Sequence, residues 1–157
     1  MIGESEMMCK KPFLKTPYGV RPIDTILSEQ ARLGSTPFPC GQCLHCRINR
    51  SRMWQHRILL EDSVSDRSCF VTLTYNEENL PKDRSLNIED YQKFLKLLRY
   101  FTKRKIRYVL VGEYGKKDER PHYHAILFGV GEDESEVIEK SWKKGFILVG
   151  DCNKYSP

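Results

Sequence analysis

Two short motifs, Gly112-Glu113-Tyr114-Gly115 and Arg120-Pro121-His122-Tyr123-His124, decide how this chain folds. Residues 106–113 and 122–128 are rich in β-branched and aromatic side chains and predict two β-strands, which the polar segment 116–121 joins as a turn. Strand side chains alternate between the two faces of a sheet, so His122 and His124 point to the same side. Pairing of the two strands across the turn then brings Glu113 near His122.

Glu113, His122 and His124 together have the composition of a divalent-metal site, with two imidazoles and one carboxylate. Their spacing does not choose between Mg²⁺, Mn²⁺ and Zn²⁺. The alternative is that both histidines are partly buried residues that only make hydrogen bonds.

The segments around the hairpin predict an α+β domain, an antiparallel sheet with helices on one face. Asn87 is the predicted N-cap of one helix, with Asp90 completing a capping box, and Gly145 is the predicted stop of another. An apolar stripe from Ile88 to Phe101 predicts core packing. The predicted helices are 43–63, 88–103 and 132–144, and the remaining strands are 68–75 and 146–149, in the order α-β-α-β-β-α-β.

The composition limits the class of protein. The chain has 157 residues, 39% hydrophobic and 30% charged, with a net charge of +5, which is compatible with nucleic-acid binding. No apolar run approaches about 18 residues and the N-terminus has no signal-like segment, so we expect a cytoplasmic protein without a membrane partner. Prolines interrupt residues 1–39, which predict an extended N-terminal arm with a short helix near 24–33. The main domain is predicted over 40–157.

Six cysteines are present, and three of them are closely spaced as Cys40-x-x-Cys43-x-x-Cys46. Disulfides are rare in the cytoplasm, so this spacing indicates metal or redox chemistry. We expect the 40–46 cluster to bind Zn²⁺, with Cys9 or His45 as the fourth ligand. The alternatives are small buried thiols or a redox pair.

The predicted 43–63 helix carries a basic face. Its members are Arg47, Arg50, Trp54 and Arg57, which lie at helical spacing on one side. Guanidinium groups around an indole suit single-stranded nucleic acid, because they contact phosphates while the ring stacks on a base. The alternative is a solvated basic face with Trp54 turned into the core.

Three ordered motifs resemble the replication initiation proteins of gokushovirus-type microviruses, which are small single-stranded DNA phages. The motifs are residues 39–47, residues 69–76, and the hairpin motifs quoted above. This resemblance implies an HUH-endonuclease-like sheet in which residues 70–75 form a central strand and Glu113, His122 and His124 bind Mg²⁺ or Mn²⁺. It also implies rolling-circle replication, in which a tyrosine nicks origin DNA, forms a 5′-phosphotyrosyl link and leaves a 3′-OH for the host replication machinery.

The chain departs from this family pattern after its last predicted strand. The family's nucleophilic tyrosine lies on a following helix, with a lysine after it, whereas Tyr155 stands beside Pro157 without one. We therefore expect a truncated initiator in a bacterial host that binds metal and DNA, has no assigned catalytic residue and forms no covalent adduct. The competing interpretations are a complete nicking enzyme, a DNA-binding module that does not cut, and a zinc-dependent nucleic-acid-binding regulator. Nothing in the sequence marks a general base for a water-using nuclease.

Overall fold

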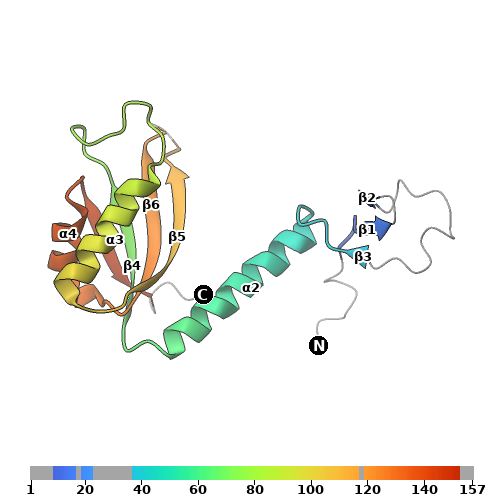
Figure 1. Ribbon diagram of the computed structural model, residues 1–157, viewed down its shortest axis with the longest axis horizontal. Coiled ribbons are helices and arrows are strands. Elements are labelled where there is room, and N and C mark those ends of the chain that lie inside the picture. Colours follow the sequence, from blue (N-terminus) through green and yellow to red (C-terminus); the bar gives the residue numbers. More distant parts are fainter. Residues whose placement is uncertain (1–8, 17–18, 23–36, 117–118, 153–157) are drawn as a thin grey trace. The chain divides into compact units, whose positions relative to one another are not determined.

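A computed structural model describes residues 9–16, 19–22, 37–116 and 119–152 (Figure 1). Contacts divide the chain into an N-terminal unit, Met1–Arg57, and a sheet unit, Ile58–Pro157. Helix α2, Leu44–Ser63, is continuous across this division. The boundary predicted after Pro39 stays a prediction. Among the described residues, no helix combines the length and apolar character that a bilayer span requires.

The sheet unit contains one four-stranded sheet in the order β5-β6-β4-β7, and all neighbouring strands are antiparallel. The α-β-α-β-β-α-β order predicted for α2 and the elements after it is confirmed, and with it the α+β class. The elements are β4 Ser68–Thr74, α3 Ile88–Thr102, β5 Arg107–Tyr114, β6 Pro121–Phe128, a 3-10 turn Glu132–Glu134, α4 Ser135–Trp142 and β7 Ile147–Asp151.

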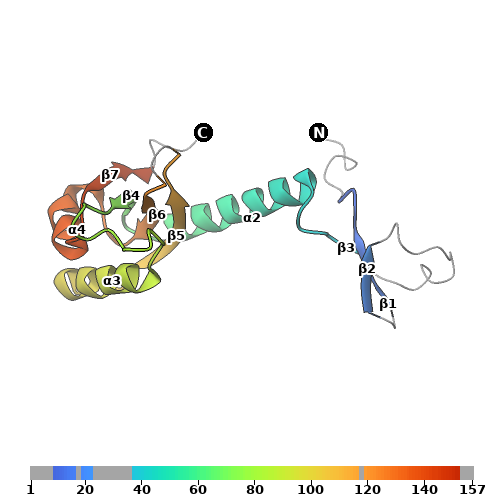
Figure 2. The same cartoon turned by 90° about the horizontal axis from the view of Figure 1, so that it is seen from above.

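The core lies between one face of this sheet and helices α3 and α4, which Figure 2 shows on the same side. Alternate residues of β4 and β6, such as Leu73 and Leu127, are fully buried there. The central part of the α3 stripe is buried as predicted, but Ile88 and Phe101 are 54% and 43% exposed. Both lie in the terminal turns of α3, so only the middle of the helix packs on the sheet.

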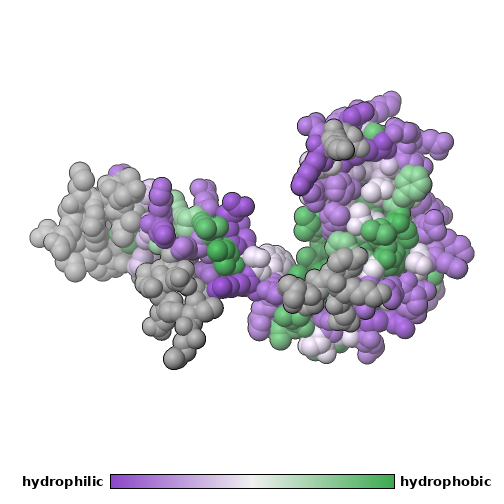
Figure 3. All heavy atoms as spheres, turned by 180° about the vertical axis from the view of Figure 1, so that it is seen from behind, coloured by the Kyte–Doolittle hydropathy of each residue, from purple (hydrophilic) through white to green (hydrophobic). Residues whose placement is uncertain are grey.

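Neither α3 nor α4 covers the other side of the sheet, which we call the open face. Figure 3 shows the sheet unit from behind, with apolar surface over this side. Val111, Phe146 and Leu148 are each more than half exposed. Because residues paired across antiparallel strands point to the same side, the register places Val111, His124, Thr72 and Leu148 in one row across this face.

Asp90 is where the structure differs from the predicted capping box. Asn87 does cap α3, and its side chain accepts a hydrogen bond from the Glu89 backbone N–H at 3.0 Å. Asp90 is instead buried, accepts from the Tyr75 hydroxyl at 3.0 Å and pairs with Lys144 at 3.2 Å. A buried carboxylate requires such partners, so it joins α3 to the chain segments that flank β4 and β7.

Gly145 is not the stop of α4, because Lys143 takes the left-handed conformation at the helix end, with φ of 53°. The glycine is needed for close approach instead. A Cβ at Gly145 would lie 2.3 Å from the Thr74 carbonyl oxygen. Its absence allows the backbone N–H groups of Thr74 and Asn76 to donate to the carbonyls of Phe146 and Lys144, both at 2.9 Å.

The N-terminal unit contains three short strands in the order β2-β1-β3, where the sequence predicted an extended arm without strands. They are β1 Phe13–Thr16, β2 Gly19–Pro22 and β3 Pro37–Phe38. Pro22 and Pro37 lie on the two edge strands, where a missing N–H costs no ladder hydrogen bond, so prolines did not exclude a sheet here. The short helix predicted at 24–33 lies outside the described residues.

Candidate metal centre and nucleic-acid surface

Glu113, His122 and His124, which we call the triad, meet at one end of the open face. The β5–β6 register pairs Glu113 with His122, as the hairpin predicted. The Glu113 Oε2 atom lies 3.4 Å from His124 Nε2 and 4.0 Å from His122 Nε2. One ligand atom from each residue lies within 4.8 Å of the others. The three side chains therefore converge on a space suited to a single ion.

Neighbouring groups hold both imidazoles by their Nδ1 atoms. His122 Nδ1 lies 3.1 Å from the Arg120 carbonyl oxygen. A carbonyl only accepts, so Nδ1 carries the proton and the Nε2 lone pair is directed toward Glu113. His124 Nδ1 lies 3.0 Å from Thr72 Oγ1, and with Nδ1–H donating to Thr72 this ring presents Nε2 in the same way.

Two supporting residues of the triad were missed by sequence reasoning. Thr72 lies opposite His124 in the β4–β6 register, and the Phe70 ring stacks on the His124 ring with centroids 5.6 Å apart. The alternation of β4 marks both as open-face residues once its antiparallel partner is known. The sequence shows the alternation but not the partner strand.

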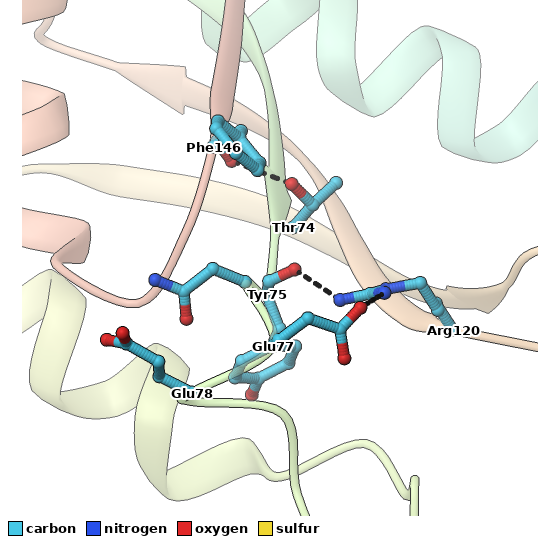
Figure 4. Close-up of a pocket in the computed structure, with 7 residues that line it drawn as sticks. Thr74, Tyr75, Glu77, Glu78, Arg120 and Phe146 are labelled. Atoms are coloured by element: carbon cyan, nitrogen blue, oxygen red, sulfur yellow. Dashed lines mark hydrogen bonds and ion pairs between the residues drawn. The ribbon is translucent and has the colours of Figure 1, made fainter.

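An open pocket of about 580 Å³ lies beside the triad (Figure 4). Thr74, which is paired with His122 across β4 and β6, forms part of its wall. The Arg120 guanidinium donates to the Tyr75 carbonyl oxygen at 3.0 Å and pairs with Glu77, while the Phe146 ring is 75% exposed. The pocket thus combines an aromatic face with polar groups next to the candidate metal centre.

The cysteine cluster consists of Cys9, Cys40, Cys43 and Cys46. Cys9 precedes β1, and the other three lie at the start of α2, so the cluster joins distant parts of the N-terminal unit. The Sγ atoms of Cys43 and Cys9 are 3.9 Å apart, and those of Cys40 and Cys46 are 4.0 Å apart. The fourth member is Cys9, and His45 is not part of the group. The cluster could hold a metal ion such as zinc.

Hydrogen bonds favour the thiolate form of two cluster members. Backbone N–H groups of Cys46 and Lys10 lower the pKa of Cys43 to about 6, and those of Cys43 and Gln42 lower the pKa of Cys40. Burial raises the pKa of Cys46 to about 12. The thiolate is the metal-binding form of cysteine, so Cys40 and Cys43 are prepared for coordination.

The predicted basic face lies on the exposed surface of α2. Trp54 is 47% exposed and the Arg57 guanidinium lies 5.4 Å from its ring centroid, so the indole is not turned into the core. Arg50 donates to the Gly41 carbonyl oxygen at 3.2 Å, which ties it to the cysteine cluster. Arg47 is exposed. A DNA-binding role for these four residues stays a prediction, and Tyr155 lies outside the described residues.

The fold and the triad define an α+β protein with two histidines on a central strand of an antiparallel sheet and a carboxylate on the neighbouring strand. The chain belongs to the replication-associated protein ORF2 family, whose family model matches residues 68–156. This match includes the whole sheet and the triad.

Three curated phage proteins are similar to the chain. It is 38% identical over 141 residues to replication-associated protein VP4 of Bdellovibrio phage phiMH2K, covering 75% of this chain and 44% of the relative. It is 33% identical over 142 residues to replication-associated protein ORF2 of Spiroplasma virus 4, with the same coverage, and 32% identical over 114 residues to replication-associated protein ORF4 of Chlamydia phage 1, covering 70% and 28%.

The chain therefore spans less than half the length of these curated relatives. The resemblance to microvirus replication proteins is confirmed. No solved structure matches the chain.

Proposed function

We propose that this chain is the metal-binding and DNA-binding part of a phage rolling-circle replication initiator. The observation that carries the proposal is the convergence of Glu113, His122 and His124 on the open face of the sheet. It is supported by membership of a family whose phage relatives are named replication-associated proteins. Single-stranded origin DNA, the host replication machinery and a location in the host cytoplasm are part of the proposal.

The donor set of the triad fits a divalent ion, and Mn²⁺ better than Mg²⁺. Mg²⁺ prefers an all-oxygen shell that includes several waters, whereas Mn²⁺ accepts imidazole nitrogens together with a carboxylate. A bound ion would supply a Lewis acid that polarises a phosphodiester oxygen. The chain's own residues do the positioning. Thr72 and the Arg120 carbonyl orient the two imidazoles, Glu113 supplies the negative charge, and the open face gives a DNA strand access.

Nicking belongs to the complete protein in this proposal. The resemblance supports attack by a tyrosine on the phosphodiester that the triad holds. A covalent protein–DNA band that requires Mn²⁺, seen by denaturing electrophoresis with the full-length protein, is the measurement for this step. Loss of that band in a Glu113→Gln protein is the expected result, and its persistence would separate the triad from nicking.

Mn²⁺ is expected to strengthen binding of single-stranded DNA to this chain by roughly tenfold, the effect of one charge-assisted contact. Fluorescence anisotropy of a labelled oligonucleotide, with and without Mn²⁺, measures the affinity. Glu113→Gln should lose the gain, because a neutral amide replaces the anionic ligand. Glu136→Gln, an exposed position on α4, is the matched control and should keep it. A wild-type affinity that ignores Mn²⁺, or an equal gain in Glu113→Gln, would contradict the proposed role of the triad.

Arg47→Ala is expected to weaken DNA binding and to reduce the log–log dependence of affinity on salt by about one, because one phosphate contact is lost. The measurement is the same anisotropy titration at several salt concentrations. Lys140→Ala, which removes an exposed cation on α4, serves as the control for net charge. An unchanged slope and affinity in Arg47→Ala would show that the basic face of α2 is only solvated.

A further inference from the structure

The sulfur positions of the cysteine cluster match one tetrahedral metal ion. Zinc–thiolate bonds of about 2.3 Å place tetrahedral sulfurs about 3.8 Å apart. The observed Sγ–Sγ distances of 3.9 and 4.0 Å agree with this spacing, and all four sulfurs lie within 4.8 Å of one another. All four cysteines are free, and a disulfide would require roughly 2 Å between sulfurs. The cluster therefore has the geometry of a coordination sphere rather than of two disulfides.

The backbone around the cluster is arranged for thiolate ligands. The Cys40 N–H donates to Cys9 Sγ and the Cys43 N–H donates to Cys40 Sγ, both at 3.3 Å. Gly41 adopts a left-handed φ of 74°, which allows the tight turn between the first two closely spaced ligands. Its carbonyl accepts from Arg50, so a residue of α2 also holds this turn.

The N-terminal unit has little apolar core that could hold it together without a metal. Among its described residues, the buried hydrophobic side chains are Leu14 and Cys46, at 2% and 7% exposure, and Cys46 is itself a cluster member. Small units of this kind usually depend on disulfides or metals, since burial alone does not offset their chain entropy. A metal that binds only the folded unit supplies that missing stability.

We propose that Cys9, Cys40, Cys43 and Cys46 bind one Zn²⁺ ion and that this ion organises residues 9–57. The site brings the segment before β1 to the first turn of α2, and it thereby orders the end of the helix that carries the basic face. Its four-sulfur donor set selects a softer metal than the nitrogen and oxygen donors of the triad. The chain therefore has two metal centres with different metal preferences.

Two other fates of the cysteines give distinct results. A Cys-x-x-Cys-x-x-Cys run with a remote cysteine also suits a four-iron cluster, but such a cluster holds its thiolates around four irons and hence further apart than around one ion. Cys40 and Cys43 could instead form a redox pair. Iron with visible absorption, or a Cys40–Cys43 disulfide found by mass spectrometry in place of metal, would overturn the proposal.

The test is the metal content of the full chain, expressed with both zinc and iron available and purified without chelator. We expect about one zinc per chain and, after exchange with Co²⁺, the sulfur-to-cobalt charge-transfer absorption of a four-thiolate site. Cys9→Ser and Cys43→Ser should each lose the zinc. Cys152→Ser changes a cysteine outside the cluster and should keep it. Full zinc retention in both cluster variants would overturn the assignment.

Hydrogen exchange of the wild-type chain gives a second measurement that does not depend on whether the variants fold. Removal of zinc should abolish amide protection over 9–57 and leave the sheet unit protected, and zinc should restore it. Equal protection of 9–57 with and without zinc would show that the ion does not organise this unit. Neither measurement uses DNA or Mn²⁺, so the result stands apart from the proposed replication function.

Discussion

Replacement of His124 by alanine is expected to lower the affinity of the triad for Mn²⁺ by at least about 100-fold, because losses of roughly 10- to 100-fold already follow from changes outside the ligand set. His124 Nε2 is the closer imidazole nitrogen to Glu113, at 3.4 Å, and β6 offers no other side chain at that point of the open face. Calorimetric titration of the zinc-loaded chain with Mn²⁺ measures the loss. Binding equal to wild type would place the ion elsewhere.

A graded series separates ligand loss from general damage to the sheet. Thr72→Val removes the hydroxyl next to His124 Nδ1 while keeping a β-branched side chain, so we expect a loss of about tenfold. Thr72→Ser keeps the hydroxyl and should bind nearly as wild type does. If Thr72→Val and Thr72→Ser have equal affinities, the hydroxyl does not position His124. Thermal unfolding of each protein checks that the fold is intact.

Replacement of Trp142 by alanine is expected to destabilise the sheet unit by about 3–5 kcal/mol, the cost of truncating a buried aromatic side chain. Trp142 is 2% exposed, and its indole N–H donates to the Thr74 carbonyl oxygen at 2.8 Å. Its ring lies 5.3 Å from Tyr75 and 6.0 Å from Phe94. The side chain therefore connects α4 to the end of β4 and to α3. Chemical denaturation followed by circular dichroism measures the change.

Two matched variants keep the Trp142 prediction testable if the alanine protein does not fold. Trp142→Phe preserves most of the ring contact but loses the donor to Thr74, so we expect a smaller loss, of about 1–3 kcal/mol. Phe146→Ala removes an aromatic ring that is 75% exposed and should change stability by less than about 0.5 kcal/mol. Similar effects of Trp142→Phe and Phe146→Ala would show that Trp142 is not a structural anchor.

The elements nearest in sequence were the ones most accurately predicted. The β5–β6 hairpin has only a short turn, so its register, with Glu113 opposite His122, is determined by local chemistry. The Asn87 cap of α3 follows from a short-range contact in the same way. The Asp90 and Gly145 roles were wrong because their partners, Tyr75 and the Thr74 carbonyl, come from a distant strand and the residue that follows it.

The sequence by itself determined the order of the helices and strands, the common side of His122 and His124, and the close spacing of three cysteines. Each of these depends on helical or strand periodicity, which acts over a few residues. Only the tertiary structure decided that β4 lies between β6 and β7, and this placement gives His124 its Thr72 partner. It also brought Cys9 to the cluster across 31 residues. Such long-range pairings depend on which buried faces pack together, and the sequence periodicity of one element carries no information about its partner.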